Sequence, residues 1–431
     1  MTRHKAEVRR RVGLTTALAV AGVLITSTVS LAAGTWTTPT VNSYLPVGDL
    51  PRYPAITPDG SHVWIPNSVS DTVTVVSTLT NSVVGTVTGI DDPYYVVFSP
   101  DGSTAYVSSD SGSPSLTGVN TTTLATTSYD LGAGVDLFGM AISPDGSYLY
   151  LADRGTTDEL LTVATATLSS PTTTPTGSVA VGAVPVGVAV SPDGLTVYVA
   201  NNGSNSVSVV DVADPTAPSI VTTISGMNVP FIVDVSPGGA TAYVANSGND
   251  TVGVIDTATN AVTGSISVGD EPFGLAISGD GAALMTANSG ANSVSVVDLA
   301  SNTVTGTASM GAGTTPRGVA FSLDGTLGYV TLEASDQLAI MSTGYTPPEA
   351  SGPNVPRAPM QQFGVAPETP ETECLTMAAE FTDGSALDWE ALTALRENGW
   401  GLSYAFWPNE GRGGWVCTRQ PYYAGPGWNV R

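Results

Sequence analysis

Histidine and lysine are scarce in this sequence, and each shortage excludes a class of chemistry. After the first 33 residues one histidine remains, His62, and there is no lysine. Histidine-rich copper and haem sites are therefore excluded, as are a lysine Schiff base and a phosphate loop that needs a lysine. No Gly-x-Ser-x-Gly nucleophile elbow is present, and a Ser-His-acid triad would have to use His62, whose ordinary role in a strand is packing or surface exposure.

A long apolar run occurs only near the start of the chain. The run at 14–31 follows three arginines at 9–11, and small residues close it at Ala32 and Ala33. This order is typical of a cleaved secretory signal covering residues 1–33. A retained membrane anchor is the alternative, but the run is near the lower length limit for a span and contains several Thr and Ser. We therefore expect a secreted protein that is extracellular or associated with the cell surface.

Positive charge is also rare. Without residues 1–33 the chain has eight arginines against 36 Asp and Glu, a formal net charge of −28. A polyphosphate or an anionic bilayer would be repelled, so nucleic acid and anionic membranes are excluded as partners. The ordinary benefit of such acidity is solubility outside the cell.

The chain has two cysteines, Cys374 and Cys417, and both lie beyond residue 372. In an exported protein such a pair is typical of a disulfide. A metal or redox site would need more ligands or closer spacing. We therefore expect a disulfide between Cys374 and Cys417.

One tetrapeptide returns along the chain and sets its architecture. It ends in Asp-Gly or a close variant, and its seven copies begin at Thr57, Ser99, Ser143, Ser191, Ser236, Ser278 and Ser322. The intervals between these copies are 42, 44, 48, 45, 42 and 44 residues. Seven copies at this period indicate an all-β fold, a seven-bladed β-propeller with four strands in each blade.

Each repeat has the same internal order, which the copy at 261–299 shows well. Runs of five to seven residues rich in Val, Ile and Thr are bounded by Gly, Asn, Asp or Pro, as in strands that end at turns. The Pro-Asp-Gly sequence suits a tight turn, because proline fixes its own φ and glycine accepts a positive φ.

The two ends of the repeat region complement each other. The seventh copy supplies three strands and then breaks off at Tyr345, whereas Val41–Val47 aligns with the fourth strand of another repeat. We therefore expect the N-terminal strand at 41–47 to pair with Leu338–Met341 and to close the last blade.

Two repeats carry a family resemblance. Thr196-Val-Tyr-Val-Ala-Asn201 and Thr241-Ala-Tyr-Val-Ala-Asn246, each followed by an alternating apolar strand, resemble the YVTN β-propeller repeat. The resemblance covers residues 36–345 and implies an exported or surface-layer-like propeller. Related propellers serve as lactonases, lyases or binding platforms, so it is specific for fold rather than activity. Streptogramin-lyase-like propellers use a histidine base with a metal, and the scarcity of histidine counts against that activity.

Carboxylates in the loops entering the first strand of each blade are candidate metal ligands. The resemblance to lactonase-like propellers implies a divalent metal on this face, and oxygen ligands suit Ca²⁺ or Mg²⁺. The predicted ligands are Asp49, Asp92, Asp136 and Asp270. The alternative is that Asp and Asn occur here because they favour turns. We expect no other cofactor.

A second candidate site follows from one position of the repeat, the residue after the loop proline. In blade order this position holds Arg52, Tyr94, Phe138, Val186, Phe231, Phe273 and Arg317. Blades one and seven are neighbours in a closed ring, so Arg52 and Arg317 should meet at the mouth of the central channel beside Tyr94. Two arginines with aromatic walls can hold a small carboxylate or an acidic sugar. The alternative is that these residues only pack the mouth, with the arginines paired to Asp49 or Asp91.

The C-terminal part differs in composition. Residues 346–372 are rich in proline and predict a linker. Residues 373–431 predict a small α+β module with a helix at 388–398 and five of the seven tryptophans. Its aromatic residues and disulfide hold so small a module together, or its exposed rings stack on sugars of the cell envelope.

Two functions remain open. The first is a secreted, non-catalytic, monomeric binding protein that presents an interaction face to a protein or glycan partner at the cell envelope. The second is a metal-dependent lactonase-type hydrolase or lyase that uses carboxylates of the same face. The first is preferred because it needs no special residues, whereas the second needs at least three oxygen ligands that converge on one point.

Overall fold

The computed structural model describes residues 34–110, 115–168, 172–347, 400–407 and 412–419. The contacts divide the chain into two units, the propeller and a part that contains the C-terminal hairpin, and each is described by itself. The predicted signal at 1–33, the linker, the helix at 388–398 and Cys374 lie outside the described residues.

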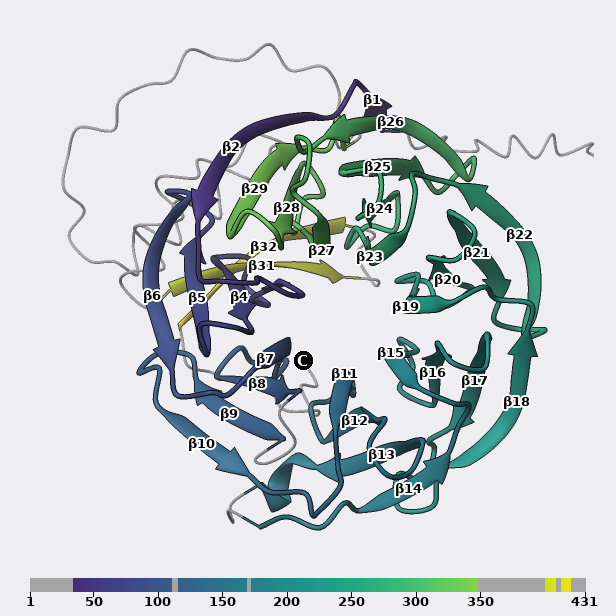
Figure 1. Ribbon diagram of the computed structural model, residues 1–431. Helices are drawn as coiled ribbons and strands as arrows, with labels where there is room; N and C mark the ends of the chain where they lie inside the picture. Colours follow the sequence, from purple (N-terminus) through teal and green to yellow (C-terminus); the bar gives the residue numbers. More distant parts are fainter. Residues whose placement is uncertain (1–33, 111–114, 169–171, 348–399, 408–411, 420–431) are drawn as a thin grey trace, which may run out of the picture. The chain divides into compact units, whose positions relative to one another are not determined.

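Seven antiparallel sheets of four strands surround a central axis, which confirms the predicted all-β fold and the number of blades (Figure 1). Blade 1 contains β3 (Ala55–Ile56), β4 (His62–Asn67), β5 (Thr72–Ser77) and β6 (Ser82–Thr88). Blade 2 contains β7 (Pro93–Phe98), β8 (Thr104–Ser109), β9 (Leu116–Asn120) and β10 (Thr126–Tyr129). Blade 3 contains β11 (Leu137–Ile142), β12 (Tyr148–Asp153), β13 (Glu159–Ala164), the 3₁₀ helix η1 (Thr165–Thr167) and β14 (Gly177–Ala180).

The remaining blades follow the same order from the axis outward. Blade 4 contains β15 (Pro185–Val190), β16 (Thr196–Asn201), β17 (Ser206–Asp211) and β18 (Ser219–Ser225). Blade 5 contains β19 (Pro230–Val235), β20 (Thr241–Asn246), β21 (Thr251–Asp256) and β22 (Ala261–Ser267). Blade 6 contains β23 (Pro272–Ile277), β24 (Ala283–Asn288), β25 (Ser293–Asp298) and β26 (Thr303–Ser309). Blade 7 contains β27 (Pro316–Phe321), β28 (Leu327–Leu332), β29 (Gln337–Ser342) and β2 (Thr40–Pro46).

The burial of each strand explains its composition. The second strand of a blade is buried on both faces, as β24 shows with all six residues buried. Outer strands are mostly exposed: β22 exposes six of its seven residues and buries only Ile266. Small and polar residues such as Ser, Thr and Gly are therefore tolerated at most positions of an outer strand. Because blades pack face to face, the second and third strands need continuous runs of Val, Ala and Leu rather than strict alternation.

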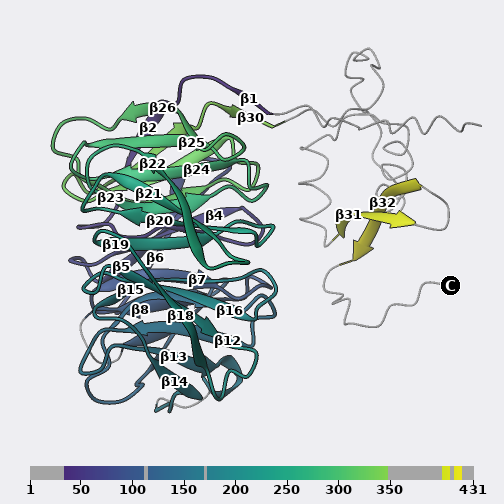
Figure 2. The same ribbon diagram turned by 90° about the vertical axis from the view of Figure 1, so that its right-hand side faces the viewer.

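The N-terminal strand closes the ring as predicted. Strand β2 pairs with β29 in antiparallel register, from Thr40 opposite Ser342 to Pro46 opposite Gln337. A second contact reinforces this closure, because β1 (Thr35–Trp36) pairs with β30 (Tyr345–Thr346), as seen from the side in Figure 2. The pairing covers the edge of β29 that the three strands of the seventh repeat alone would leave open.

The Asp-Gly turns form a ring of their own on one face, here called the bottom face. In the turn at Ser143, Ser143 Oγ donates to Asp145 Oδ1 at 2.5 Å, and the N–H of Ser147 donates to the same oxygen at 3.0 Å. Gly146 has φ +75°, and a Cβ there would lie 2.7 Å from Cδ of Pro100 in the preceding turn. Glycine is therefore required both by the turn and by its contact with the neighbouring blade.

The C-terminal unit contains one described hairpin. Strand β31 (Trp400–Trp407) pairs with β32 (Arg412–Arg419), and Cys417 lies opposite Leu402. The predicted disulfide cannot be placed, because Cys374 lies outside the described residues. In the part of the chain that the structure describes, no helix has the length and apolar character of a membrane span.

Candidate functional site

Two loops of each blade meet on the face opposite the Asp-Gly turns, here called the top face. One loop enters the first strand, and the other joins the second strand to the third. In blade 1 the N–H of Ser68 donates to the carbonyl of Leu50 at 3.1 Å, and in blade 7 the N–H of Glu333 donates to that of Thr315 at 3.1 Å. Equivalent bonds recur in the other blades, so the repeat itself brings the two loops together around the axis.

Asp and Asn side chains in these loops join each blade to the next. The acceptor is a side-chain oxygen in the loop after the second strand, and the donor is the backbone N–H just before the proline of the following blade. The described pairs are Asp71 with Asp92, Asp158 with Val184, Asn205 with Val229, Asp250 with Glu271, Asn292 with Thr315 and Asp336 with Leu50. The last pair crosses the junction between blades 7 and 1, at 2.9 Å.

These inter-blade hydrogen bonds are made by residues whose backbone has an unusual conformation. The donor residues have positive φ, including the β-branched Val184 (53°), Val229 (50°) and Thr315 (44°), for which this conformation is costly. A hydrogen bond to each N–H stabilises the conformation at every such junction. The side-chain oxygens of these Asp and Asn residues are therefore structural, because they bond the backbone of the next blade.

Arg52 and Arg317 meet at one carboxylate, that of Glu333. Arg52 Nη1 lies 3.2 Å from Oε1, and Arg317 Nε lies 3.5 Å from Oε2. The two arginine side chains are 13% and 14% exposed, and Glu333 is 24% exposed. The approach of the arginines follows from ring closure, but the suggested pairing with Asp49 or Asp91 is wrong, because Glu333 is the carboxylate that both arginines contact.

Aromatic rings flank the two ion pairs of Glu333 with Arg52 and Arg317, which are here called the bridge. The guanidinium carbon of Arg52 lies 4.6 Å from the ring centre of Tyr94, and that of Arg317 lies 4.1 Å from the ring centre of Phe273. Phe231 is 5.0 Å from Arg317. Phe138 joins the two groups, because its ring centre lies 4.5 Å from that of Tyr94 and 5.5 Å from that of Phe231. Six of the seven predicted mouth positions, all but Val186, thus form one set of arginine–aromatic and aromatic–aromatic contacts.

A third arginine lies on the same face and was not predicted. Arg154 forms ion pairs with Asp110 and, at 3.4 Å from Nε to Oδ2, with Asp136. Its guanidinium carbon lies 4.6 Å from the ring centre of Phe138. Arg154 follows the second strand of blade 3, and Glu333 and Asp110 hold the same position in blades 7 and 2. An alignment of the residue after the second strand in all seven repeats would have found Arg154, Glu333 and Asp110.

The mouth is tightly packed. Tyr94 is 5% exposed, whereas Phe138 and Val186 are each 2% exposed. Tyr53 stacks on Tyr95 with 4.4 Å between ring centres. Among the described residues, the buried hydroxyls of both tyrosines and Nε of Arg317 have no hydrogen-bond partner. The mouth therefore combines close packing with several polar groups whose hydrogen bonds are unmade.

Burial and neighbouring charges shift several pKa values here. Burial raises the pKa of Tyr53, so its hydroxyl stays protonated. Burial also raises the pKa of Asp92 and of Asp136, and Asp110 adds to both shifts while arginines oppose them. For Arg317, burial acts to lower the pKa, but neighbouring groups that include the Glu333 carboxylate outweigh it, so the guanidinium stays charged.

The four predicted metal ligands lie in the entering loops of different blades. Asp136 pairs with Arg154, and Asp92 donates its N–H to Asp71. Asp49 donates its N–H to Ser70, and the carbonyl of Asp270 accepts from Gly290. Within the described ranges, no three His, Cys, Asp or Glu side chains gather as metal ligands would. The predicted Ca²⁺ or Mg²⁺ site stays a prediction.

His62 lies beside an Asp-Gly turn on the bottom face. Its Nδ1 is 2.7 Å from Ser61 Oγ, and Ser61 Oγ donates to Asp59 Oδ1 at 2.8 Å. In a Ser-His-acid triad the carboxylate contacts the histidine, whereas here it contacts the serine. The three residues therefore form a turn network rather than a triad.

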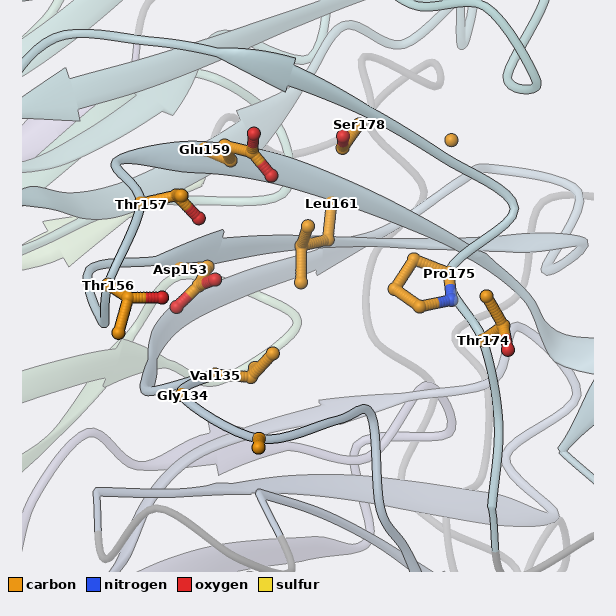
Figure 3. Close-up of a pocket in the computed structure, with 12 residues that line it drawn as sticks. Gly134, Val135, Asp153, Thr156, Thr157, Glu159, Leu161, Thr174, Pro175 and Ser178 are labelled. Atoms are coloured by element: carbon orange, nitrogen blue, oxygen red, sulfur yellow. The ribbon is translucent and has the colours of Figure 1, made fainter.

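A surface pocket in blade 3 has no arginine among the described residues that line it. It has a volume of about 360 Å³, and Figure 3 shows Asp153, Thr156, Thr157 and Glu159 on one side of the hollow and Thr174 and Pro175 on the other. Blade 3 has the longest repeat interval, and its outer strand β14 is only four residues long. The extra residues and the short strand leave this hollow.

Comparisons with known proteins agree with the propeller fold. A family model described as YNCE-like beta-propeller matches residues 14–111, and one described as Lactonase, 7-bladed beta-propeller matches residues 120–236. The hydrazine synthase of Kuenenia stuttgartiensis is a similar solved structure, with a TM-score of 0.60 and 22% identity over 70% of this chain and 97% of that chain. At this identity the likeness shows the fold alone. A comparison with curated proteins found no match.

Proposed function

We propose that the chain is an exported, non-catalytic binding protein of the YVTN-repeat type, whose top-face mouth recognises a carboxylate or an acidic sugar. One observation carries this proposal. Between residues 34 and 347 the chain has only three arginines and no lysine, and all three lie around the same mouth on aromatic rings. Scattered arginines would serve solubility, whereas their collection at one place suits recognition of an anionic group.

The net charge of the bridge indicates that its ligand is an anion. Two guanidiniums share the single carboxylate of Glu333, so the bridge has a formal charge of plus one. Elsewhere the protein is acidic, and a positive point at the centre of a negative surface directs small anions to that point. A ligand carboxylate would supply the second counter-charge and would accept hydrogen bonds from the arginines.

Binding of small carboxylates to the mature protein, residues 34–431, tests this function. Titration calorimetry with glucuronate, galacturonate and acetate should show binding that neutral glucose lacks. Arg52→Gln should weaken it at least tenfold, whereas Arg412→Gln in the C-terminal hairpin serves as a matched control and should leave it unchanged. If no carboxylate binds, or if both variants bind alike, the proposal is wrong.

Location and partners complete the proposal. The signal at 1–33 directs export, and the aromatic module at 373–431 retains the protein on envelope glycans. The high negative charge favours a monomer that binds neither nucleic acid nor anionic membranes. A pull-down of the full mature chain and of residues 34–347 on cell-wall material tests the tail, because only the full chain should be retained.

A lactonase-type hydrolase is the second candidate, and the lactonase family-model match over residues 120–236 favours it. Such an enzyme needs a divalent metal at the top face, and Asp49, Asp92, Asp136 and Asp270 do not come together to hold one. Metal analysis of the purified protein and melting with and without chelator separate the candidates. Bound metal with chelator-sensitive melting would favour the enzyme.

A further inference from the structure

The blade 3 pocket is lined by polar side chains that are free to bind a ligand. Its hydroxyls come from Thr156, Thr157, Thr174 and Ser178, and it has the half-buried carboxylate of Glu159. Among the described residues, none of these five side chains makes a hydrogen bond or an ion pair. Hydroxyls both donate and accept, so they match the hydroxyl groups of a polyol.

The strand register directs these groups to one side of the blade. Glu159 lies opposite Asp153 in β12, and Leu161 lies opposite Ser178 in β14. Residues two apart on a strand share a face, so Glu159 and Leu161 point to the same side as these partners. The carboxylates and the hydroxyl therefore surround the apolar side chain of Leu161, as Figure 3 shows.

Asp153 is held in place beneath the pocket. It is 3% exposed, and its Oδ1 accepts the N–H groups of Asp136 and Gly155, each at 2.9 Å. Glu159 has no such partner and remains available to a ligand. Arg154, which follows Asp153 in the sequence, forms ion pairs with Asp110 and Asp136, and no arginine is among the described residues that line the pocket.

Charge and shape together define the ligand class. Two carboxylates without a cation in the lining repel anions and attract an ammonium group. The hydroxyls suit sugar hydroxyls, and Val135, Leu161 and Pro175 offer an apolar surface for a sugar ring. We propose that this pocket binds an amino sugar with a free ammonium group, with Glu159 as its counter-ion. The inference goes beyond the function proposed for the arginine mouth, which attracts the opposite charge.

The test uses glucosamine as the probe, with glucose, N-acetylglucosamine and glucuronate as comparators, in calorimetric or NMR titrations of the mature chain. Glucosamine should bind at least tenfold more tightly than glucose or N-acetylglucosamine, and glucuronate, whose proposed site is the arginine mouth, should not compete with it. Glu159→Gln keeps the shape of the side chain and removes its charge, so it should weaken glucosamine binding at least tenfold. Glu271→Gln removes one carboxylate from the top-face loop of blade 6 and is the matched control.

Each result decides the proposal. Equal binding of glucosamine and glucose, unchanged glucosamine binding by Glu159→Gln, or no glucosamine binding overturns it. Arg52→Gln tests the arginine mouth separately, because it should leave glucosamine binding unchanged while it weakens glucuronate binding. Unchanged melting temperatures of the variants show that the comparisons concern folded protein.

Discussion

Arg52 in the first blade and Glu333 in the seventh form an ion pair, with 3.2 Å between Nη1 and Oε1. The pair crosses the junction where the N-terminal strand closes the ring. Thr331 holds the backbone at the same junction, because its Oγ1 donates to the carbonyl of Arg52 at 2.6 Å and accepts from the N–H of Gly318 at 2.8 Å. The position of Arg52 therefore depends on contacts with blade 7.

Replacing Thr331 by valine should destabilise the propeller. The substitution keeps the shape but leaves the buried carbonyl of Arg52 and the N–H of Gly318 without this partner, at a cost of about 2 to 4 kcal/mol. Thr331→Ser retains the hydroxyl and should cost about 1 kcal/mol, the loss of one buried methyl group. Denaturant unfolding measures both, and equal losses in the two variants would show that the hydroxyl is unimportant.

The hydrogen bond from the N–H of Leu50 to Asp336 should stabilise the junction between blades 7 and 1. Asp336→Gly removes the acceptor but tolerates the φ of 54°, so it should lower the free energy of unfolding by about 1 to 2 kcal/mol. Asp336→Asn should be close to wild type, because Asn205 and Asn292 make the same bond at other junctions. Equal destabilisation by Gly and Asn would contradict this role.

Asp234 in β19 makes stability depend on pH. Its carboxylate accepts the N–H of Ile277 at 3.0 Å, and burial raises its pKa to about 6. A folded pKa above the unfolded value of about 4 means that the folded state holds more protons between pH 4 and 6, so this group's contribution to stability falls as pH rises through that window. Ala189 and Ala276 hold the equivalent position in other blades.

Asp234→Asn keeps an acceptor for Ile277 and removes the charge. It should raise the free energy of unfolding at pH 8 by about 1 to 3 kcal/mol and change it little at pH 4. Chemical unfolding at both pH values measures the difference. A gain of the same size at pH 4 and pH 8 would refute the assignment, and Glu271→Gln controls for a general effect of lowering the negative charge.

The fold was predictable because its signals repeat. Seven turns of one repeat, six of them with Asp-Gly, and a missing fourth strand after Met341 leave few alternatives to a closed ring, and β2 pairs with β29 as predicted. The meeting of Arg52 and Arg317 followed from that closure. Glu333 and Arg154 were missed because Ser or Asn occupies their position of the repeat in four of the seven blades, so this position does not show a charged site in most copies.

The blade 3 pocket could not be predicted for a different reason. Its hollow results from the four-residue strand β14 and the connection before it, and the 48-residue repeat interval shows an insertion but not the space that it leaves. Whether an Asp in a loop binds a metal or only favours a turn was also open, because both uses suit the same residue. The backbone hydrogen bonds of Asp71, Asp250 and Asp336 show a use that was not predicted, the joining of adjacent blades.

The most direct test of the arginine mouth is the affinity of glucuronate for Glu333→Gln, measured by calorimetry beside Arg52→Gln and wild type. Glu333 competes with a ligand carboxylate for the same guanidiniums, so its neutralisation should strengthen binding about tenfold, whereas Arg52→Gln should weaken binding about tenfold. Opposite shifts in two folded variants would support recognition of a carboxylate at this bridge. Binding that falls in Glu333→Gln, or that neither variant changes, would contradict it.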